Sequence, residues 1–347
     1  MDIPDRAVKK QHQRAVGVRD VAAHAGVSLG TVSNVLNNPE RVGPEIRERV
    51  QSAMKELGFV PSRAAGQLRS RRSGLIGVIV PDVGNPFWAK VLRGVETVVD
   101  AAKLTMVVGS TRQDDARQRH LLRVLDGQGV DGLIIAPIVS PNGDLVPFEH
   151  RRYGVVTLER DGGGSAGAWV GLDNVEGARL AMSHLLEQGH RRIALVNGSQ
   201  SVSWCAERRE GAVLAIQQTG LDPDVVMVDV EVPDLTVDEG TDAMRHLLAH
   251  EQVTAVMCVN DMLALGALLE LRAQGVRVPE QMALIGYDDA DFAPALDPPM
   301  STVHQPAFMM GEAAARLLLE KPEQRSGAHI GFEPRLVVRA STVVAES

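Results

Sequence analysis

The chain has 347 residues, which is too many for one small core and typical of two or three domains. Its formal net charge of −8 is unevenly spread: residues 1–74 carry 13 Lys and Arg against 7 Asp and Glu, whereas the remainder carries 23 against 37. A basic head on an acidic body fits a head that contacts phosphate groups and a body that does not. No apolar run reaches the roughly 18 residues of a membrane-spanning helix, so no membrane span is expected.

Two further features favour an intracellular protein. Residues 1–17 are polar and basic and lack the apolar segment of an export signal, so we expect a cytoplasmic protein whose N-terminal arm is flexible. The arm either helps to bind phosphates or has no role. The two cysteines, Cys205 and Cys258, have no metal-type spacing and are expected to be reduced and buried. We predict no metal and no cofactor.

Residues 18–37 predict two short helices, Arg19–Ala25 and Leu29–Leu36, joined by a tight turn at Gly26, Val27 and Ser28. Glycine allows a sharp turn, and Ser28 can accept a hydrogen bond from the free N–H groups of the second helix. The residues expected to face inward are Val32, Val35 and Leu36. The opposite face carries Leu29, Gly30, Ser33 and Asn34, which are short enough to meet base edges. This pattern is typical of a helix-turn-helix in a DNA major groove, and a helical cap on a larger domain is the alternative.

A third amphipathic helix is predicted over Pro44–Leu57, with a proline in its first turn. Its apolar stripe comprises Ile46, Val50, Met54 and Leu57. The three helices define a DNA-binding domain over residues 18–60. Residues 61–73, which are rich in Arg, Ala and Ser, form a linker to a body at 74–347.

The body alternates apolar strands with helical segments. The predicted strands are Leu75–Val80, Thr105–Gly109, Gly132–Ala136, Val155–Leu158, Trp169–Leu172, Ile193–Asn197, Val225–Val228, Ala255–Val259 and Met282–Gly286. The predicted helices are Trp88–Ala102, Arg112–Gln128, Val175–Gln188, Glu207–Gln218, Val237–His250 and Asp261–Gln274. This order indicates parallel α/β structure, and the number of strands favours two doubly wound lobes. Ligands of such sheets bind at the carboxyl ends of the strands, here in a cleft between the lobes.

From residue 17 onward the sequence resembles the lac-repressor family of bacterial transcription regulators. The matching residues are Asp20-Val21-Ala22, Ala25-Gly26-Val27-Ser28, Thr31-Val32-Ser33, Val35-Leu36-Asn37, Glu56-Leu57-Gly58 and Pro61-Ser62. The resemblance implies a body of the periplasmic-binding-protein type I fold, in which the chain crosses three times between the lobes. We expect the crossings near Leu172, Met300 and Ile330. One lobe then holds about 74–172 and 301–330, and the other holds about 173–300 and 331–347.

The resemblance also implies DNA contacts. Leu29, Gly30 and Asn34 should face bases, with Ser28, Thr31 and Ser33 nearby and Asn37 and Arg41 on the backbone. Family members commonly carry arginine in place of Asn34, and because asparagine pairs best with adenine, we expect an altered half-site. Residues 62–69 resemble the family's hinge helix, which orders on DNA beside its twin. Leu68 would wedge into the minor groove, and the hinge residues expected to contact DNA are Arg63, Ala65, Leu68 and Arg69. Gly66 departs from the usual bulkier residue and weakens this helix.

Family positions also mark an effector site. Its expected residues are Phe87, Trp88, Glu159, Arg160, Asp173, Trp204, Arg208, Asn260 and Asp288. Phe87 and Trp88 could instead be core aromatics, and Asp173 could be a helix cap. Carboxylates, amides and aromatic rings suit a sugar, and a nucleoside or purine is the alternative. The sequence does not reveal whether the effector raises or lowers DNA affinity.

The resulting prediction is a dimeric repressor that binds an inverted-repeat operator and a small-molecule effector. A dimer is expected because no leucine heptads follow Val337–Thr342. A solute-binding protein of a sugar transporter would have a similar body, but the helix-turn-helix and the missing export signal argue against it. An enzyme is not predicted, because no G-x-S-x-G elbow or zinc triad is present. The Gly-rich residues 162–167 lack the Lys-Ser/Thr pair of a phosphate loop.

Overall fold

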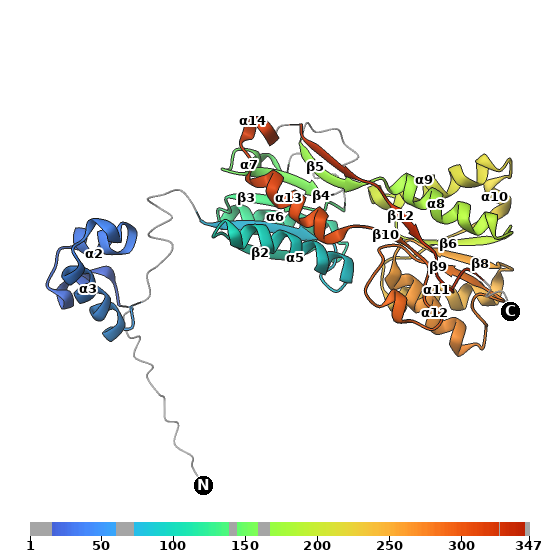
Figure 1. Cartoon of the computed structure of the whole chain (residues 1–347), viewed down its shortest axis with the longest axis horizontal. Coiled ribbons are helices and arrows are strands. Elements are labelled where there is room, and N and C mark those ends of the chain that lie inside the picture. The colour runs from blue at the N-terminus through green and yellow to red at the C-terminus, as the bar shows by residue number, and fades with distance from the viewer. Residues whose placement is uncertain (1–15, 60–72, 139–143, 159–166, 326, 344–347) are drawn as a thin grey trace, which may run out of the picture. The chain divides into compact units, whose positions relative to one another are not determined.

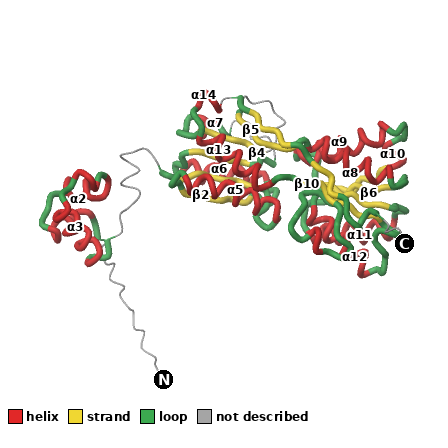
Figure 2. The backbone as a smooth tube through the Cα atoms, in the orientation of Figure 1, coloured by secondary structure: helices red, strands yellow, loops and turns green. Residues whose placement is uncertain are grey.

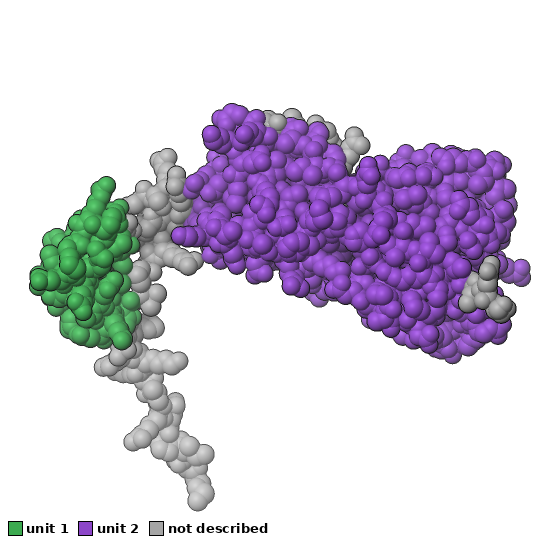
Figure 3. Space-filling model, viewed as in Figure 1, with its two compact units in different colours: residues 1–71 green, residues 72–347 purple. Residues whose placement is uncertain are grey.

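A computed structural model of the chain describes residues 16–59, 73–138, 144–158, 167–325 and 327–343. The chain forms two compact units, Met1–Arg71 and Arg72–Ser347 (Figure 3). No helix in these ranges is both long enough and apolar enough to cross a membrane.

The first unit is a small helical bundle. Its elements are α1 (Val18–Ala25), α2 (Leu29–Asn37), a 3₁₀ turn η1 (Pro39–Arg41) and α3 (Pro44–Glu56). Gly26 ends α1 with φ of 61°, and the Ser28 hydroxyl accepts a hydrogen bond from the Thr31 N–H at 3.1 Å, so the turn residues act as predicted. The predicted stripe of α3 is wrong at Ile46, which is 37% exposed, whereas Val50 and Ala53 are buried.

The second unit contains a six-stranded parallel sheet in the order β11-β5-β4-β3-β1-β2. The strands are β1 (Leu75–Val80), β2 (Thr105–Ser110), β3 (Gly132–Ile135), β4 (Gly154–Leu158), β5 (Ala168–Leu172) and β11 (His329–Phe332). The helices around it are α5 (Pro86–Ala101), α6 (Asp115–Gly127), α7 (Val146–Glu149), α13 (Ala307–Leu319) and α14 (Pro322–Arg325). α5 and α13 share a core with β1 on one face, and α6 and α7 cover the other. We call this part the six-stranded lobe.

A four-stranded parallel sheet in the order β7-β6-β8-β9 forms the second half, the four-stranded lobe (Figure 1). Its strands are β6 (Ile193–Asn197), β7 (Met227–Glu231), β8 (Ala255–Cys258) and β9 (Ala283–Ile285). Its helices are α8 (Asn174–Glu187), α9 (Ser203–Gln218), α10 (Pro223–Val226), α11 (Val237–His250), α12 (Asp261–Ala273) and the 3₁₀ turn η2 (Ala293–Ala295). α8 and α9 approach closely at Gly211, where a Cβ atom would lie 2.0 Å from the Val175 carbonyl oxygen.

The chain crosses between the lobes at three places in the described residues (Figure 2). It leaves β5 at Leu172 for α8, passes from β10 (Thr302–His304) into α13, and returns from β11 into β12 (Arg335–Val337). β10 and β12 pair with each other as antiparallel strands. Ser301 bridges to Ile285 at the end of β9, and His304 bridges to Asp288 in the loop that follows. Residues 301–304 therefore stay with the four-stranded lobe for a few residues beyond the crossing expected near Met300.

The predicted α/β class is confirmed, and most elements lie within two residues of their predicted ends. The strand predicted at Val225–Val228 is wrong at its start, because Asp222 caps the short helix α10 there and β7 begins at Met227. α9 begins four residues before the predicted Glu207, because its first turn buries Trp204 and Cys205. The sequence pattern did not predict α13 or strands β10 to β12.

Candidate functional site

One small cavity inside the second unit lies where elements of both lobes meet. Its lining comes from the first turn of α5, from α9, from the residues that follow β8 and β9, and from the connection after β10. The residues that line it are Asn85, Phe87, Trp88, Trp204, Arg208, Asn260, Asp288 and Gln305. Its volume of about 20 Å³ has room for about one water molecule. Because ligand pockets commonly measure about 300 Å³ or more, the cleft is closed in this structure.

The aromatic side of the cavity is built at the start of α5. Asn85 caps this helix, its side-chain oxygen accepting a hydrogen bond from the Phe87 N–H at 2.9 Å. The rings of Phe87 and Trp88 meet edge to face, with centroids 4.8 Å apart. Both rings are buried and contribute to the core of the six-stranded lobe as well as to the cavity wall. Phe87 and Trp88 are thus both core aromatics and part of the cavity wall.

Arg208 is a buried cation beside this wall. Its Nε donates to the Asn174 side-chain oxygen at 3.0 Å, and its Nη1 donates to the Val259 carbonyl. The guanidinium carbon lies 3.7 Å from the centroid of the Tyr287 ring and 5.1 Å from that of Trp204. A guanidinium held on two sides by aromatic faces and hydrogen bonds is fixed in one orientation. Its remaining N–H groups can therefore be presented to a ligand without further ordering.

Asp288 supplies the opposite charge. Its φ of 116° is unusual for a residue other than glycine. Gln305 Nε2 donates to Asp288 Oδ1 at 2.7 Å. Burial raises the pKa of Asp288 from an ordinary 3.8 to about 7, although Arg208, Gln305 and Asn85 each favour the charged form. Gln305 is 2% exposed, and its side-chain oxygen has no hydrogen-bond partner among the described residues. The cavity thus contains both a carboxyl group and a free acceptor.

The residues that follow β8 also form hydrogen bonds that stabilise the fold. Asn260 caps α12, accepting from the Leu263 N–H at 2.8 Å and donating to the Leu235 carbonyl at 3.1 Å. The neighbouring Asp261 does not line the cavity. Its carboxylate accepts from the Ala290 N–H and from the Thr302 hydroxyl, and burial together with Asp288 raises its pKa. Asp261 is therefore a structural carboxyl group that holds the loop after β9.

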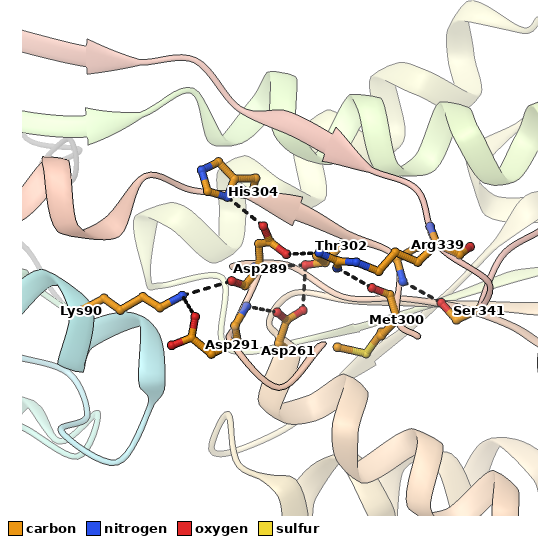
Figure 4. Close-up of polar contacts among 11 residues, drawn as sticks. Lys90, Asp261, Asp289, Asp291, Met300, Thr302, His304, Arg339 and Ser341 are labelled. Atoms are coloured by element: carbon orange, nitrogen blue, oxygen red, sulfur yellow. Dashed lines mark hydrogen bonds and ion pairs between the residues drawn. The ribbon is translucent and has the colours of Figure 1, made fainter. Parts of the chain in front are cut away.

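Contacts between the lobes hold the loop that follows β9 (Figure 4). The Lys90 ammonium of α5 lies 2.8 Å from the Asp291 carboxylate and donates to the Asp289 carbonyl at 3.3 Å. The Asp289 carboxylate binds His304 Nδ1 at 2.9 Å and Arg339 Nη2 at 2.7 Å. The loop that carries Asp288 is thus tied to α5, to β10 and to the residues that follow β12.

Asp173, another predicted effector residue, does not line the cavity. Asp173 caps α8, accepting from the Glu176 N–H at 2.9 Å, and borders a separate hollow beside Trp169. The alternative interpretation of Asp173, as a helix cap, is therefore the one that the structure supports. Glu159 and Arg160 lie outside the described residues. Sequence reasoning missed Gln305 as a site residue, because nothing in its local sequence distinguishes it from a loop glutamine.

The predicted DNA-facing residues lie on one side of α2 and its flanks. Leu29 is 48% exposed despite its apolar side chain, and Gly30 and Asn34 are exposed beside it. Ser28 Oγ and Thr31 Oγ1 form a hydrogen bond of 2.9 Å. Ser33 is half-buried on α2, and Arg41 is exposed on η1. The side chain of Asn37 is not among the described ones, and the hinge residues Arg63, Ala65, Leu68 and Arg69 lie outside the described ranges.

A three-helix head and a two-lobed body that closes around a polar cavity define a class of ligand-responsive DNA-binding proteins. Residues 18–62 match the bacterial regulatory proteins of the lacI family, and residues 182–342 match a periplasmic binding protein-like domain. The chain is 32% identical to the HTH-type transcriptional repressor CytR of Escherichia coli K12, over 96% of this chain and 98% of CytR. It is 36% identical to the HTH-type transcriptional regulator CelR of Thermobifida fusca, over 95% and 99% of the two chains.

Solved structures of the same family are also similar to this chain. The lac repressor dimer bound to operator and the anti-inducer ONPF superposes with a TM-score of 0.80 at 26% identity, over 95% of this chain and 100% of that one. A CelR–cellobiose complex superposes with a TM-score of 0.69 at 34% identity, over 94% and 99%. The chain belongs to the lacI family of bacterial transcription regulators and carries the family's helix-turn-helix DNA-binding domain.

Proposed function

We propose that this protein is a homodimeric repressor whose affinity for an inverted-repeat operator is controlled by a small molecule bound between the two lobes. The similar lac repressor was solved as a dimer on operator DNA, which supports the dimer and the operator. Two-fold symmetry of the protein requires two-fold symmetry in the site that it reads. We place its action in the cytoplasm and assign it no enzymatic activity, no metal and no cofactor. Its named relatives are transcription regulators.

On DNA, α2 would lie in the major groove with Leu29, Gly30 and Asn34 on the bases. Their exposure supports this assignment, because α2 has apolar packing only on its opposite side. Ser28, Thr31, Ser33, Asn37 and Arg41 would contact phosphates or base edges. Leu29 and Gly30 have no side-chain hydrogen-bond donors, so among these three residues Asn34 would carry the direct base readout.

Residues 62–69 would form the hinge helix, with Arg63, Ala65 and Arg69 on DNA and Leu68 wedged into the minor groove. Leu68→Gly should remove specific operator affinity and spare binding to random-sequence DNA. An unchanged operator affinity in this variant would exclude the wedge.

The effector is a sugar, with a nucleoside or purine as the second possibility. The observation that carries this assignment is the buried cavity in which Arg208 and Asp288 stand beside three aromatic rings. A guanidinium donor, a carboxyl group and flat apolar faces suit a ring that bears several hydroxyl groups. The similar CelR was solved with cellobiose, and another lacI-family regulator, from Enterococcus faecium, was solved with ribose. Glu159, Arg160 and Asp173 remain proposed contributors.

Regulation follows from linkage. A ligand shifts the balance between open and closed lobes only by the difference of its affinities for the two states. Because the closed cavity has room for about one water molecule, an effector requires a wider arrangement of the lobes than this one. That change would alter the spacing of the two hinge segments in a dimer and so alter operator affinity.

Two measurements test the proposal. Selection from a pool of random duplexes should yield an approximate inverted repeat that the full chain binds. A thermal-shift screen with cellobiose, ribose, adenosine and hypoxanthine should find a ligand that raises the melting temperature. Arg208→Met should abolish this rise, whereas Arg209→Met on the exposed side of the same helix should keep it. Failure to select any sequence would reject the DNA-binding proposal, and a ligand response that survives in Arg208→Met would reject the cavity.

A further inference from the structure

Asp131 holds the first described residues of the second unit. It is 4% exposed and directly precedes β3. One carboxylate oxygen accepts a hydrogen bond from the Ser73 N–H at 3.1 Å, and the other accepts from the Gly74 N–H at 2.8 Å. Ser73 is the last residue of the linker 61–73, and Gly74 is the first residue of the body. Both oxygens of this buried carboxylate thus bind the backbone at the point where the linker joins the body.

The same point is tied to the starts of four neighbouring strands. The Gly74 carbonyl accepts from the first residue of β2, Thr105, at 2.8 Å. The backbone of Asp131 donates to the Leu75 carbonyl of β1 at 2.8 Å and accepts from Tyr153, just before β4, at 2.9 Å. Gly74 has φ of 68°, so the chain turns there in a conformation that glycine adopts freely. The turn at Gly74 is therefore fixed to the sheet of the six-stranded lobe from several sides.

A buried carboxylate is costly unless hydrogen bonds compensate its lost hydration. Asp131 obtains this compensation from the joining segment, which has no part in the cavity or in the core beneath β3. A role confined to packing would be met by an apolar side chain of similar volume. A carboxylate with two acceptor oxygens instead binds two successive backbone N–H groups, and this fixes the direction in which the chain leaves the body.

We propose that Asp131 is a positioning residue for DNA binding, which anchors the linker so that movements of the six-stranded lobe reach it as rigid displacements. The inference rests on the proposed control of operator affinity through the linker. Asp131 does not line the cavity. A loose attachment would let the linker absorb a lobe movement and would add a conformational entropy cost to operator binding in each subunit of a dimer.

The test uses the full chain and the duplex that the wild type selects from a random pool. Asp131→Asn keeps the shape but turns an NH₂ group toward one of the two backbone N–H donors. We expect operator affinity to fall by about tenfold, affinity for a random-sequence duplex to stay unchanged, and amide exchange at Gly74 to accelerate. Asp126→Asn is the matched control, because that exposed carboxylate pairs with Arg151 on the same lobe and should change none of the three readings.

A second variant guards against misfolding of the first. Ser73→Pro deletes the N–H donor to Asp131 and also the hydroxyl that accepts from the Leu75 N–H, while it leaves the carboxylate in place. It loosens the same junction and should lower operator affinity in the same direction. Wild-type operator affinity in either folded variant, together with faster amide exchange at Gly74, would overturn the inference. A wild-type chain that selects no duplex would instead reject the proposed DNA binding itself, so the two failures are distinguishable.

Discussion

Asp288→Asn should change how the stability of the protein depends on pH. Burial raises the pKa of Asp288 to about 7 in the folded chain, against an ordinary value of 3.8. The folded state therefore holds this proton more tightly than the unfolded state does. For such a group, stability is greatest below the unfolded pKa and is lost as pH rises toward the folded pKa, which is the reverse of a salt-bridged aspartate.

The size of the effect follows from the two pKa values. Between about pH 5 and pH 8, native and unfolded values of about 7 and 3.8 give a loss of about 3 kcal/mol in unfolding free energy. An amide does not titrate, so Asp288→Asn should remove this loss. The amide also turns an NH₂ group toward Gln305 or Asn85, both of which donate to Asp288, at a cost of about 1–3 kcal/mol at every pH. The variant should be less stable than the wild type in acid and should match or exceed it in mild alkali.

Urea unfolding at several pH values measures this directly. The quantity to plot is the difference in unfolding free energy between wild type and variant, because titrating groups that do not interact with Asp288 contribute equally to both curves. Asp261 interacts with Asp288, so the difference reports the titration of this pair. Asp291→Asn serves as the control for the loss of a carboxylate, since that side chain is 89% exposed and does not line the cavity. A difference between wild type and Asp288→Asn that is equal at pH 5 and pH 8 would show that Asp288 titrates normally.

Three further predictions concern other parts of the molecule. Gly211→Ala should destabilise the second unit by about 3 kcal/mol, because its new methyl group would meet the Val175 carbonyl, and a thermal melt of the full chain checks this. Ser28→Ala should cost about 1 kcal/mol in the first unit by removing the cap that binds the Thr31 N–H, and unchanged amide exchange across α2 would contradict it. Asn34→Arg should move the preference of the adjoining base pair from adenine to guanine by about 1–3 kcal/mol, and equal binding of both duplexes in gel shifts would count against this role.

Local signals in the sequence explain why many elements were predictable. The predicted helix Val237–His250 matches α11 at both ends, because Thr236 precedes it and caps it through the Glu239 N–H. The turn between α1 and α2 is similarly marked by Gly26 and Ser28. In each case the residue that ends or starts the element acts on a neighbour three or four positions away.

The site was less predictable, because its geometry depends on distant contacts. Asp173 and Asn260 both follow strands and both cap helices, and the sequence does not distinguish the one that also lines the cavity. The contacts of Asp289 with His304 and Arg339 join residues 15 and 50 positions apart. Gln305 reaches Asp288 only because β10 lies beside the end of β9. Such pairings follow from the path of the chain between lobes, which no local pattern encodes.

The crossing of the chain through β10 has a consequence for how the protein is made. The six-stranded lobe contains α13 and β11, which the ribosome synthesises only after all four strands of the four-stranded sheet. Until then, the face of α5 that later packs against α13 has no cover, and β5 lacks its outer neighbour. The lobe joined to the linker is thus begun first, and it is completed only after the four-stranded sheet has been made. We expect a nascent chain to hold its DNA-binding head beside a half-built body for most of translation, and that body to close only when the final tenth or so of the protein has emerged.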